Sequence, residues 1–204
     1  MCWSEGLSAN DRSEGTNMAS QNAAKGATDT QEFKDPQVYR HALQVITTAI
    51  SSAKNLDSML LDLNERILDF FNCERNAIYV IDPGTKQLFS RFKVGTLLSE
   101  IRIPISTENI AGYTALTGTV INISDAYNEE EVKAIHPDLQ FDQSWDGKSG
   151  YHTTQVLATP IQFEGKILGV LQLTNRNDGS KFTRDDETSA EEIAKILAIG
   201  LQKH

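Results

Sequence analysis

The stretch QVLATPIQFEGKILGVLQLTNR, residues 155–176, decides the fold of this chain. It holds two apolar runs, Gln155–Ile161 and Lys166–Thr174, joined by the short turn Gln162–Gly165. Both runs are rich in the β-branched and aliphatic residues that suit a pleated, buried surface. Strands joined by so short a turn pair antiparallel, because parallel strands need a long crossover connection. The stretch therefore predicts an antiparallel hairpin.

More strands are predicted upstream, where apolar and polar residues alternate. Alternation runs through 77–81 and 88–94, and it continues over 101–105 with isoleucine at every second position. This period of two is typical of a strand with one buried face. The sequence Asp82–Thr85 between the first two segments contains Pro-Gly, the chemistry of a tight turn. We also expect a brief strand at 120–123.

Two long helices are predicted before these strands, and one after them. Apolar residues recur every three or four positions over 36–53 and 56–71, and Asn55 is a suitable N-cap for the second helix. The last helix begins at Thr183, which forms a capping box with Asp186. Helices combined with an antiparallel sheet indicate an α+β fold in which the helices cover one face of the sheet.

A short helix is predicted over 109–116, ending at Gly118, with Ser106 or Thr107 as its N-cap. Its free backbone N–H groups make a helix N-terminus suited to an anion. On pattern alone an ordinary helix start is the commoner explanation. A long polar connection, 124–152, follows, with a small helix near 129–134. Connections of this length in compact domains are usually functional or disordered.

Composition divides the chain and excludes several kinds of partner. Residues 1–34 are poor in large apolar side chains, so we expect a disordered tail there, followed by a folded domain over 35–204. The net charge of −9, without a basic stripe, argues against nucleic acid and anionic membranes. No run is apolar enough to span a bilayer and no signal peptide is apparent, so a cytoplasmic location is expected.

The sequence offers no assembled catalytic or metal site. Its four histidines are scattered, and it lacks the spacings of metal ligands, of a nucleophile elbow and of a phosphate-binding loop. The carboxylate run Glu129–Glu131 is better explained as a solvated helix start than as a metal site. We therefore expect no metal, and no enzymatic activity in this chain.

Several separated segments, taken in order, resemble the GAF domains of cyclic nucleotide phosphodiesterases and of related bacterial sensors. They are Glu100–Pro104, Asn109–Gly112, Asn122–Tyr127, Ser149–Leu157 with Pro160 and Ile161, and Gly169–Leu173. The resemblance covers about residues 36–203, nearly everything outside the tail. It implies that 35–204 is one GAF domain. The implied fold is a central antiparallel sheet of about six strands, with the long terminal helices on one face and a ligand pocket on the other.

The C-terminal part carries a version of the NKFDE motif of that family, with arginine in place of lysine. Its residues are Asn175, Arg176, Phe182, Asp186 and Glu187. In the family the lysine and the aspartate form an ion pair that braces the pocket, and arginine keeps the charge for such a pair. An equally simple role is to pin the strand to the last helix, and the two roles are compatible.

The resemblance further implies where the ligand would bind. By position, the pocket residues are Phe92, Ile110, Ala111, Gly112, Phe141, Asp142, Ser149, Thr153 and Gln172. Backbone groups of Ile110 and Ala111 would contact a cyclic phosphate, with small residues there permitting close approach. Phe92 or Phe141 would stack on a purine. The implied ligand is cyclic AMP or cyclic GMP, with no covalently attached cofactor, since Cys73 precedes the first strand.

Three functions stay open on this sequence. The first is a regulatory module that senses a cyclic nucleotide and transmits the change through its terminal helices. The second is a ligand-free dimerisation or interaction module, in which the face of Ile196 and Ile199 and the first helix form a homodimer. The third is a regulatory fragment of a larger signalling enzyme or ATPase. Phytochrome-type and methionine-sulfoxide-reductase-type modules of the fold are disfavoured, because both need cysteines in the pocket region.

Overall fold

A computed structural model describes residues 35–94 and 97–203. The predicted tail, 1–34, lies outside the described residues. Ala42–His204 form one compact unit, and the chain before Ala42 belongs to a separate one. In chain order the helices and strands are α2 (Pro36–Ser52), α3 (Leu56–Phe71), β1 (Cys73–Asp82), β2 (Gln87–Val94), β3 (Leu97–Pro104), α4 (Ile110–Thr117), β4 (Ile121–Ile123), α5 (Glu129–Ile135), α6 (Ser144–Ser149), β5 (Val156–Phe163), β6 (Lys166–Arg176) and α7 (Arg184–Leu201).

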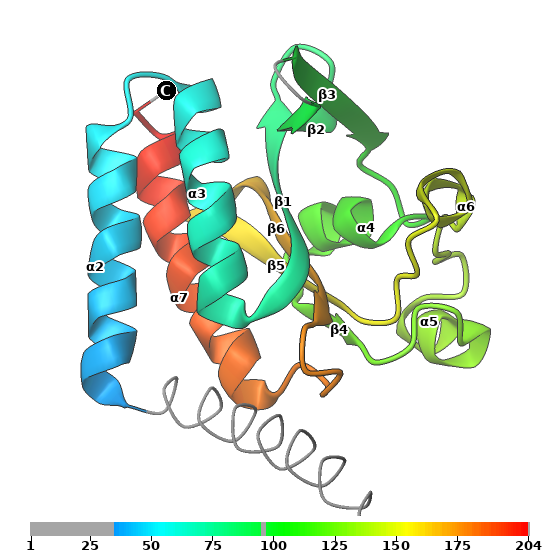
Figure 1. Ribbon diagram of the computed structural model, residues 1–204. Coiled ribbons are helices and arrows are strands. Elements are labelled where there is room, and N and C mark those ends of the chain that lie inside the picture. Colours follow the sequence, from blue (N-terminus) through cyan, green and yellow to red (C-terminus); the bar gives the residue numbers. More distant parts are fainter. Residues whose placement is uncertain (1–34, 95–96, 204) are drawn as a thin grey trace, which may run out of the picture. The chain divides into compact units, whose positions relative to one another are not determined.

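The centre of the fold is a six-stranded antiparallel sheet in the order β3-β2-β1-β6-β5-β4. The sequence hairpin becomes β5 and β6, and β6 pairs on its other side with β1. Helices α3 and α7 lie on one side of the sheet, together with the part of α2 that follows Ala42. Helices α4, α5 and α6 lie on the other side (Figure 1). The predicted α+β fold is therefore confirmed. None of the described helices is both long and apolar enough to cross a bilayer.

Each face of the sheet carries its own core. Alternation along β5 and β6 sends Leu157, Leu171 and Leu173, all fully buried, toward the long helices. The residues between them, such as Val156 and Val170, join a second apolar cluster with α4 and α5. This second cluster supports the face on which the ligand pocket is expected.

The helix signals of the sequence are largely realised. Asn55 caps α3 and Thr183 caps α7, each in a capping box, the latter with Asp186 as predicted. The N-cap of α4 is Asn109, so the expectation of Ser106 or Thr107 was wrong by two or three residues. The short helix α6 was not anticipated. It lies in the long connection, where six residues are too few to show a helical period.

The hairpin of β2 and β3 diverges from the rest of the sheet. Eight residue pairs join β2 to β3, but only three, Val80–Asp82 with Gln87–Phe89, join β1 to β2. Beyond Phe89 the hairpin rises away from β1 (Figure 1). This divergence leaves room beside β1, and a cavity opens there.

Candidate functional site

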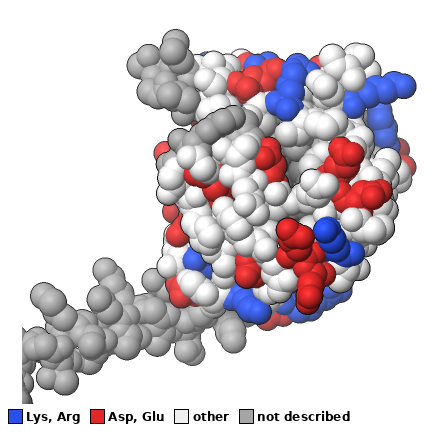
Figure 2. All heavy atoms as spheres, turned by 90° about the vertical axis from the view of Figure 1, so that its right-hand side faces the viewer, with Lys and Arg blue, Asp and Glu red and all other residues white. Residues whose placement is uncertain are grey.

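An open cavity of about 1530 Å³ lies over the sheet, between α4, the 140–146 segment, the β2–β3 hairpin and α3. Acidic side chains are scattered over the face shown in Figure 2, interspersed with a few Lys and Arg side chains. Of the nine residues expected at a ligand, seven line this cavity: Phe92, Ile110, Ala111, Phe141, Asp142, Thr153 and Gln172. These seven residues come from five separate segments of the chain.

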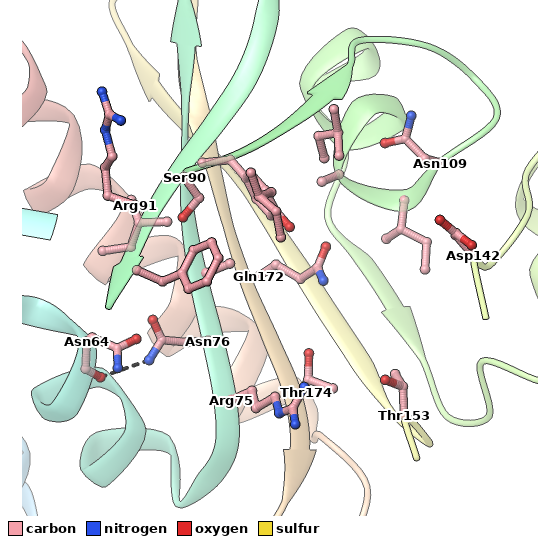
Figure 3. A pocket seen from close by; sticks show the side chains of 18 of the residues that line it. Asn64, Arg75, Asn76, Ser90, Arg91, Asn109, Asp142, Thr153, Gln172 and Thr174 are labelled. Carbon is pink, nitrogen blue, oxygen red and sulfur yellow. Dashed lines mark hydrogen bonds between the residues drawn. The ribbon is translucent and has the colours of Figure 1, made fainter. Parts of the chain in front are cut away.

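The floor of the cavity is made by one face of β1, β2 and β6. Register places Arg75 opposite Thr174 and Ala77 opposite Gln172, so alternate residues of both strands point to the same side. Figure 3 shows Gln172, Thr174 and Ser90 along this floor. Tyr79 completes the floor, and burial raises the pKa of its hydroxyl to about 12.

The polar groups of this floor belong to largely enclosed residues and have no hydrogen-bond partner among the described residues. Ser90, Thr174 and Tyr79 are only 8%, 8% and 9% exposed. None of their hydroxyls, nor the Gln172 amide, forms a hydrogen bond with another described residue. Buried polar groups in proteins are almost always hydrogen-bonded. The floor therefore presents unmatched donors and acceptors to whatever fills the cavity.

The N-terminus of α4 forms the roof. The Asn109 side chain accepts a hydrogen bond from the N–H of Gly112 at 2.7 Å and donates to Pro104 O at 3.0 Å. This cap ties the helix to the end of β3. Ile110 and Ala111 line the cavity in the first turn, where helical N–H groups have no intrahelical partner.

Gly112, expected to contact the ligand, does not line the cavity. Its N–H is taken by Asn109, and a Cβ on Gly112 would lie 2.5 Å from Pro104 O. The glycine is needed because the helix start packs closely on the end of β3. Gly112 therefore has a packing role in this structure, and its place at a ligand stays a prediction.

One wall of the cavity is organised by Asp146, a residue that sequence reasoning missed. Its carboxylate is 7% exposed and accepts hydrogen bonds from the N–H of Thr153 at 2.6 Å, from Thr153 Oγ1 at 2.9 Å and from the Tyr127 hydroxyl at 3.0 Å. The Tyr127 ring stacks on His152 and meets Phe141 edge-on. Burial and the Asp146 carboxylate raise the pKa of Tyr127. Asp146 thus holds the long connection against the start of β5.

The remaining expected ligand residues occupy the rim. Asp142 lines the cavity, and its carboxylate accepts a hydrogen bond from the Ser144 N–H at 2.9 Å (Figure 3). Phe92 lines the opposite side, on the β2–β3 hairpin, and is 38% exposed. The side chain of Ser149 lies outside the described part of the chain.

Asn175 holds the segment that leads from this wall into β5. Its backbone is left-handed, with φ of 49°, and its side chain is directed across the strand end. The side-chain oxygen of Asn175, Oδ1, accepts hydrogen bonds from the N–H groups of Thr154 and Gln155, at 2.8 and 2.9 Å, and its side-chain Nδ2 donates to His152 O at 2.8 Å. The neighbouring cavity residue, Thr153, is therefore held in place from both sides.

The other motif residues connect β6 to α7. Arg176 is 10% exposed and donates to both carboxylate oxygens of Asp186, at 3.0 and 3.1 Å. Phe182 is buried, and Glu187 accepts a hydrogen bond from the Asn122 amide at 2.8 Å, which adds β4 to the network. None of the five motif residues lines the cavity. They fix the strands and the helix around it.

Two kinds of reactive group are relevant among the described residues, a metal site and a free thiol. They contain no group of three His, Cys, Asp or Glu side chains suited to a metal ion. Cys73 is 3% exposed, and burial raises the pKa of its thiol to about 12. A thiol held neutral in this way is a poor nucleophile.

The floor residues were missed because the alternation of a β-strand shows which residues share a face, but not which face lines a cavity. Once Gln172 is placed in the pocket, period two puts Thr174 beside it, and this signal was available in the sequence. Tyr79 and Ser90 could be placed at the cavity only by knowing which strands are neighbours in the sheet. Asp146 could be placed there only by knowing that α6 forms.

Comparison with known proteins assigns the family. The model of the GAF domain matches residues 55–201. The chain is 29% identical over 180 residues to a probable 3',5'-cyclic phosphodiesterase pde-5 of Caenorhabditis elegans, covering 82% of this chain and 23% of that protein. It is 27% identical over 184 residues to the dual 3',5'-cyclic-AMP and -GMP phosphodiesterase 11 of Drosophila melanogaster, covering 83% and 12%. The chain thus spans less than a quarter of the length of these relatives.

Solved structures share the fold at low sequence identity. The GAF domain of an Acinetobacter phosphoenolpyruvate-protein phosphotransferase superposes with a TM-score of 0.59 at 16% identity, covering 80% of this chain and 92% of that one. A free methionine-R-sulfoxide reductase of Neisseria meningitidis gives a TM-score of 0.61 at 21% identity, covering 81% and 89%. With the fold, the cavity and the family model in agreement, the chain belongs to the GAF domain family.

Proposed function

We propose that this domain is a regulatory sensor that binds a cyclic nucleotide, cyclic AMP or cyclic GMP, in the cavity beneath α4. The relatives named above are cyclic nucleotide phosphodiesterases, which favours this class of ligand. The cavity supplies the chemistry that such a ligand needs: a helix N-terminus, aromatic side chains at its rim and polar groups at its floor.

The cyclic phosphate binds at the first turn of α4. Free N–H groups at a helix N-terminus, together with the positive end of the helix dipole, attract anions. Ile110 and Ala111 present their backbone there, and Asn109 has already capped the next N–H. The nucleoside then extends across the sheet, where Phe92 or Phe141 stacks on the base.

One observation carries this proposal: Ser90, Tyr79 and Thr174 are largely buried residues that line the cavity, and their hydroxyls have no partner among the described residues. A ligand that displaced water from these hydroxyls without replacing its hydrogen bonds would incur a cost of about 1–3 kcal/mol for each. A nucleoside carries hydroxyl, carbonyl, amine and ring-nitrogen groups that can satisfy them. An apolar ligand could not.

The role is regulatory rather than catalytic. The buried Cys73, with its raised pKa, does not provide a reactive thiol at the cavity. Ligand binding would instead be transmitted through the α7 helix, which the Arg176–Asp186 pair joins to β6. A ligand shifts such an element only if it binds one arrangement more tightly than the other.

Calorimetric titration with cyclic AMP and cyclic GMP tests the proposal, using two matched variants. Thr174→Val removes a floor hydroxyl, and Thr159→Val removes a more deeply buried, unpartnered hydroxyl whose register turns it to the opposite face. Loss of one hydrogen bond of about 1 kcal/mol predicts an affinity several-fold weaker for Thr174→Val. Thr159→Val should bind as the parent does.

Two outcomes would remove support. Folded, ligand-free protein that gives no binding heat with either nucleotide would rule out the proposed ligand class. Equal weakening by both valine variants would show that binding does not take place on the Thr174 face.

A second function, self-association through the terminal helices, is favoured by one feature of α7. Ile199 is 53% exposed on the outer side of this helix, and Ile196 beside it is half-buried. An exposed isoleucine beside a half-buried one on a helix suits contact with a second copy of the same helix. Sedimentation of the parent and of Ile199→Glu measures this: a dimer that the charge dissociates supports it, and a monomeric parent refutes it.

A further inference from the structure

Arg75 is a cationic side chain that faces the cavity without a counter-ion. It lies on β1 opposite Thr174, and both side chains line the cavity floor (Figure 3). The Arg75 guanidinium forms no ion pair or hydrogen bond with the residues that the structure describes. Its one described contact is the ring of Tyr151, whose centroid lies 3.4 Å from Arg75 Cζ.

The acidic residue beside it is already engaged. The Glu74 carboxylate accepts a hydrogen bond from the Tyr151 hydroxyl at 2.7 Å and another from the Asn175 amide at 3.0 Å. In this acidic chain other arginines are neutralised, as Arg91 is by Asp57 and Glu100. Arg75 therefore keeps its full charge and its hydrogen-bonding capacity for a ligand.

Stacking on Tyr151 fixes the plane of the guanidinium. A guanidinium that covers an aromatic face still directs its N–H groups outward, in its own plane. Tyr151 is itself held by Glu74, so the donor fork is oriented before any ligand arrives. Such preorganisation lowers the entropic cost of binding.

A planar fork of donors selects a partner that offers acceptors and no donor. Guanine offers this on one edge, with O6 and N7 both acceptors, whereas adenine has N7 beside an amino donor. Arg75 adjoins Gln172 and Thr174 on the floor where the base of a nucleotide would lie. The geometry points to Arg75 as the residue that makes the cavity select a guanine over an adenine cyclic nucleotide. This inference rests on the proposed binding of cyclic nucleotides.

Competitive titration with cyclic GMP, cyclic IMP and cyclic AMP tests the assignment. Hypoxanthine keeps O6 and N7 but lacks the 2-amino group of guanine, so cyclic IMP isolates the edge that Arg75 would read. The parent should bind cyclic GMP and cyclic IMP about tenfold more tightly than cyclic AMP, a low value for a bidentate contact because Arg75 is exposed. Arg75→Ala should bind all three with similar affinity.

Lys195→Ala is the charge-matched control. Lys195 is an exposed cation on α7, across the sheet from the cavity, so its loss should leave the preference unchanged. A preference that survives in Arg75→Ala, or a parent that treats cyclic IMP like cyclic AMP, overturns the assignment while nucleotide binding stands. A parent that binds none of the three overturns the proposed function itself, and this assignment with it.

Discussion

Replacing Asp146 by alanine should destabilise the domain far more than replacing Asp142, although both carboxylates line the cavity. The Asp146 carboxylate is buried and accepts three hydrogen bonds, two from Thr153 and one from Tyr127. Asp142 is exposed, and its carboxylate accepts a hydrogen bond from the Ser144 N–H.

The two losses can be sized from these contacts. Hydrogen bonds to charged groups contribute about 1.5–3 kcal/mol each. The two hydroxyls can turn to other acceptors, but the Thr153 N–H at 2.6 Å cannot, so Asp146→Ala should lower the free energy of unfolding by about 3 kcal/mol. Asp142→Ala removes the hydrogen bond from the Ser144 N–H, which resembles a helix cap and contributes about 1 kcal/mol to the free energy of unfolding.

Urea unfolding followed by far-ultraviolet circular dichroism measures both losses under one set of conditions. Amide hydrogen exchange at Thr153 adds a local readout, since only Asp146→Ala should expose that N–H. Equal unfolding free energies for the two variants, with Thr153 still protected, would refute the reasoning. In that case the hydrogen bonds of Asp146 would contribute nothing beyond those of an exposed carboxylate.

Three further outcomes follow from contacts in the fold. Gly112→Ala should cost about 1–3 kcal/mol in urea unfolding, because its Cβ would lie 2.5 Å from the carbonyl that ends β3, whereas Gly147→Ala, with nothing within 4 Å, should cost no stability. Asp186→Asn should lower the free energy of unfolding several times as much as Asp185→Asn in the same assay. Of the two, only Asp186 pairs with Arg176 and caps its own helix. Burial raises the pKa of Cys73 from 9.0 to about 12, so unfolding releases a proton above pH 9, and stability should fall between about pH 9 and 12; Cys73→Ala should flatten that part of a stability–pH curve.

Sequence patterns identified the elements that carry their own period or punctuation. The hairpin of β5 and β6 and the helices α3 and α7 follow from local alternation and from caps such as Asn55 and Thr183. These signals each lie within about a dozen neighbouring residues, so they can be recognised without knowledge of tertiary packing.

The site was only partly accessible in this way. Ile110 and Gln172 could be placed by resemblance, because each belongs to a recognisable local segment. Asp146 could not, because its importance depends on Thr153 and Tyr127 folding back around it. The packing role of Gly112 was also not predictable, because a small residue at a helix start permits either a ligand or a neighbouring strand to come close.

The order of strands has a consequence for how the chain acquires this structure. The central pair of the sheet joins β1 to β6, bringing Arg75 against Thr174 across most of the length of the domain. Contacts so distant in sequence require a large loop to close before they stabilise anything, which slows folding. During synthesis the edge of β1 that pairs with β6 therefore stays unpaired until β6 has left the ribosome. The domain is exposed to aggregation for as long as the ribosome takes to translate the chain from β1 to β6. That same stretch contributes most of the residues that line the cavity.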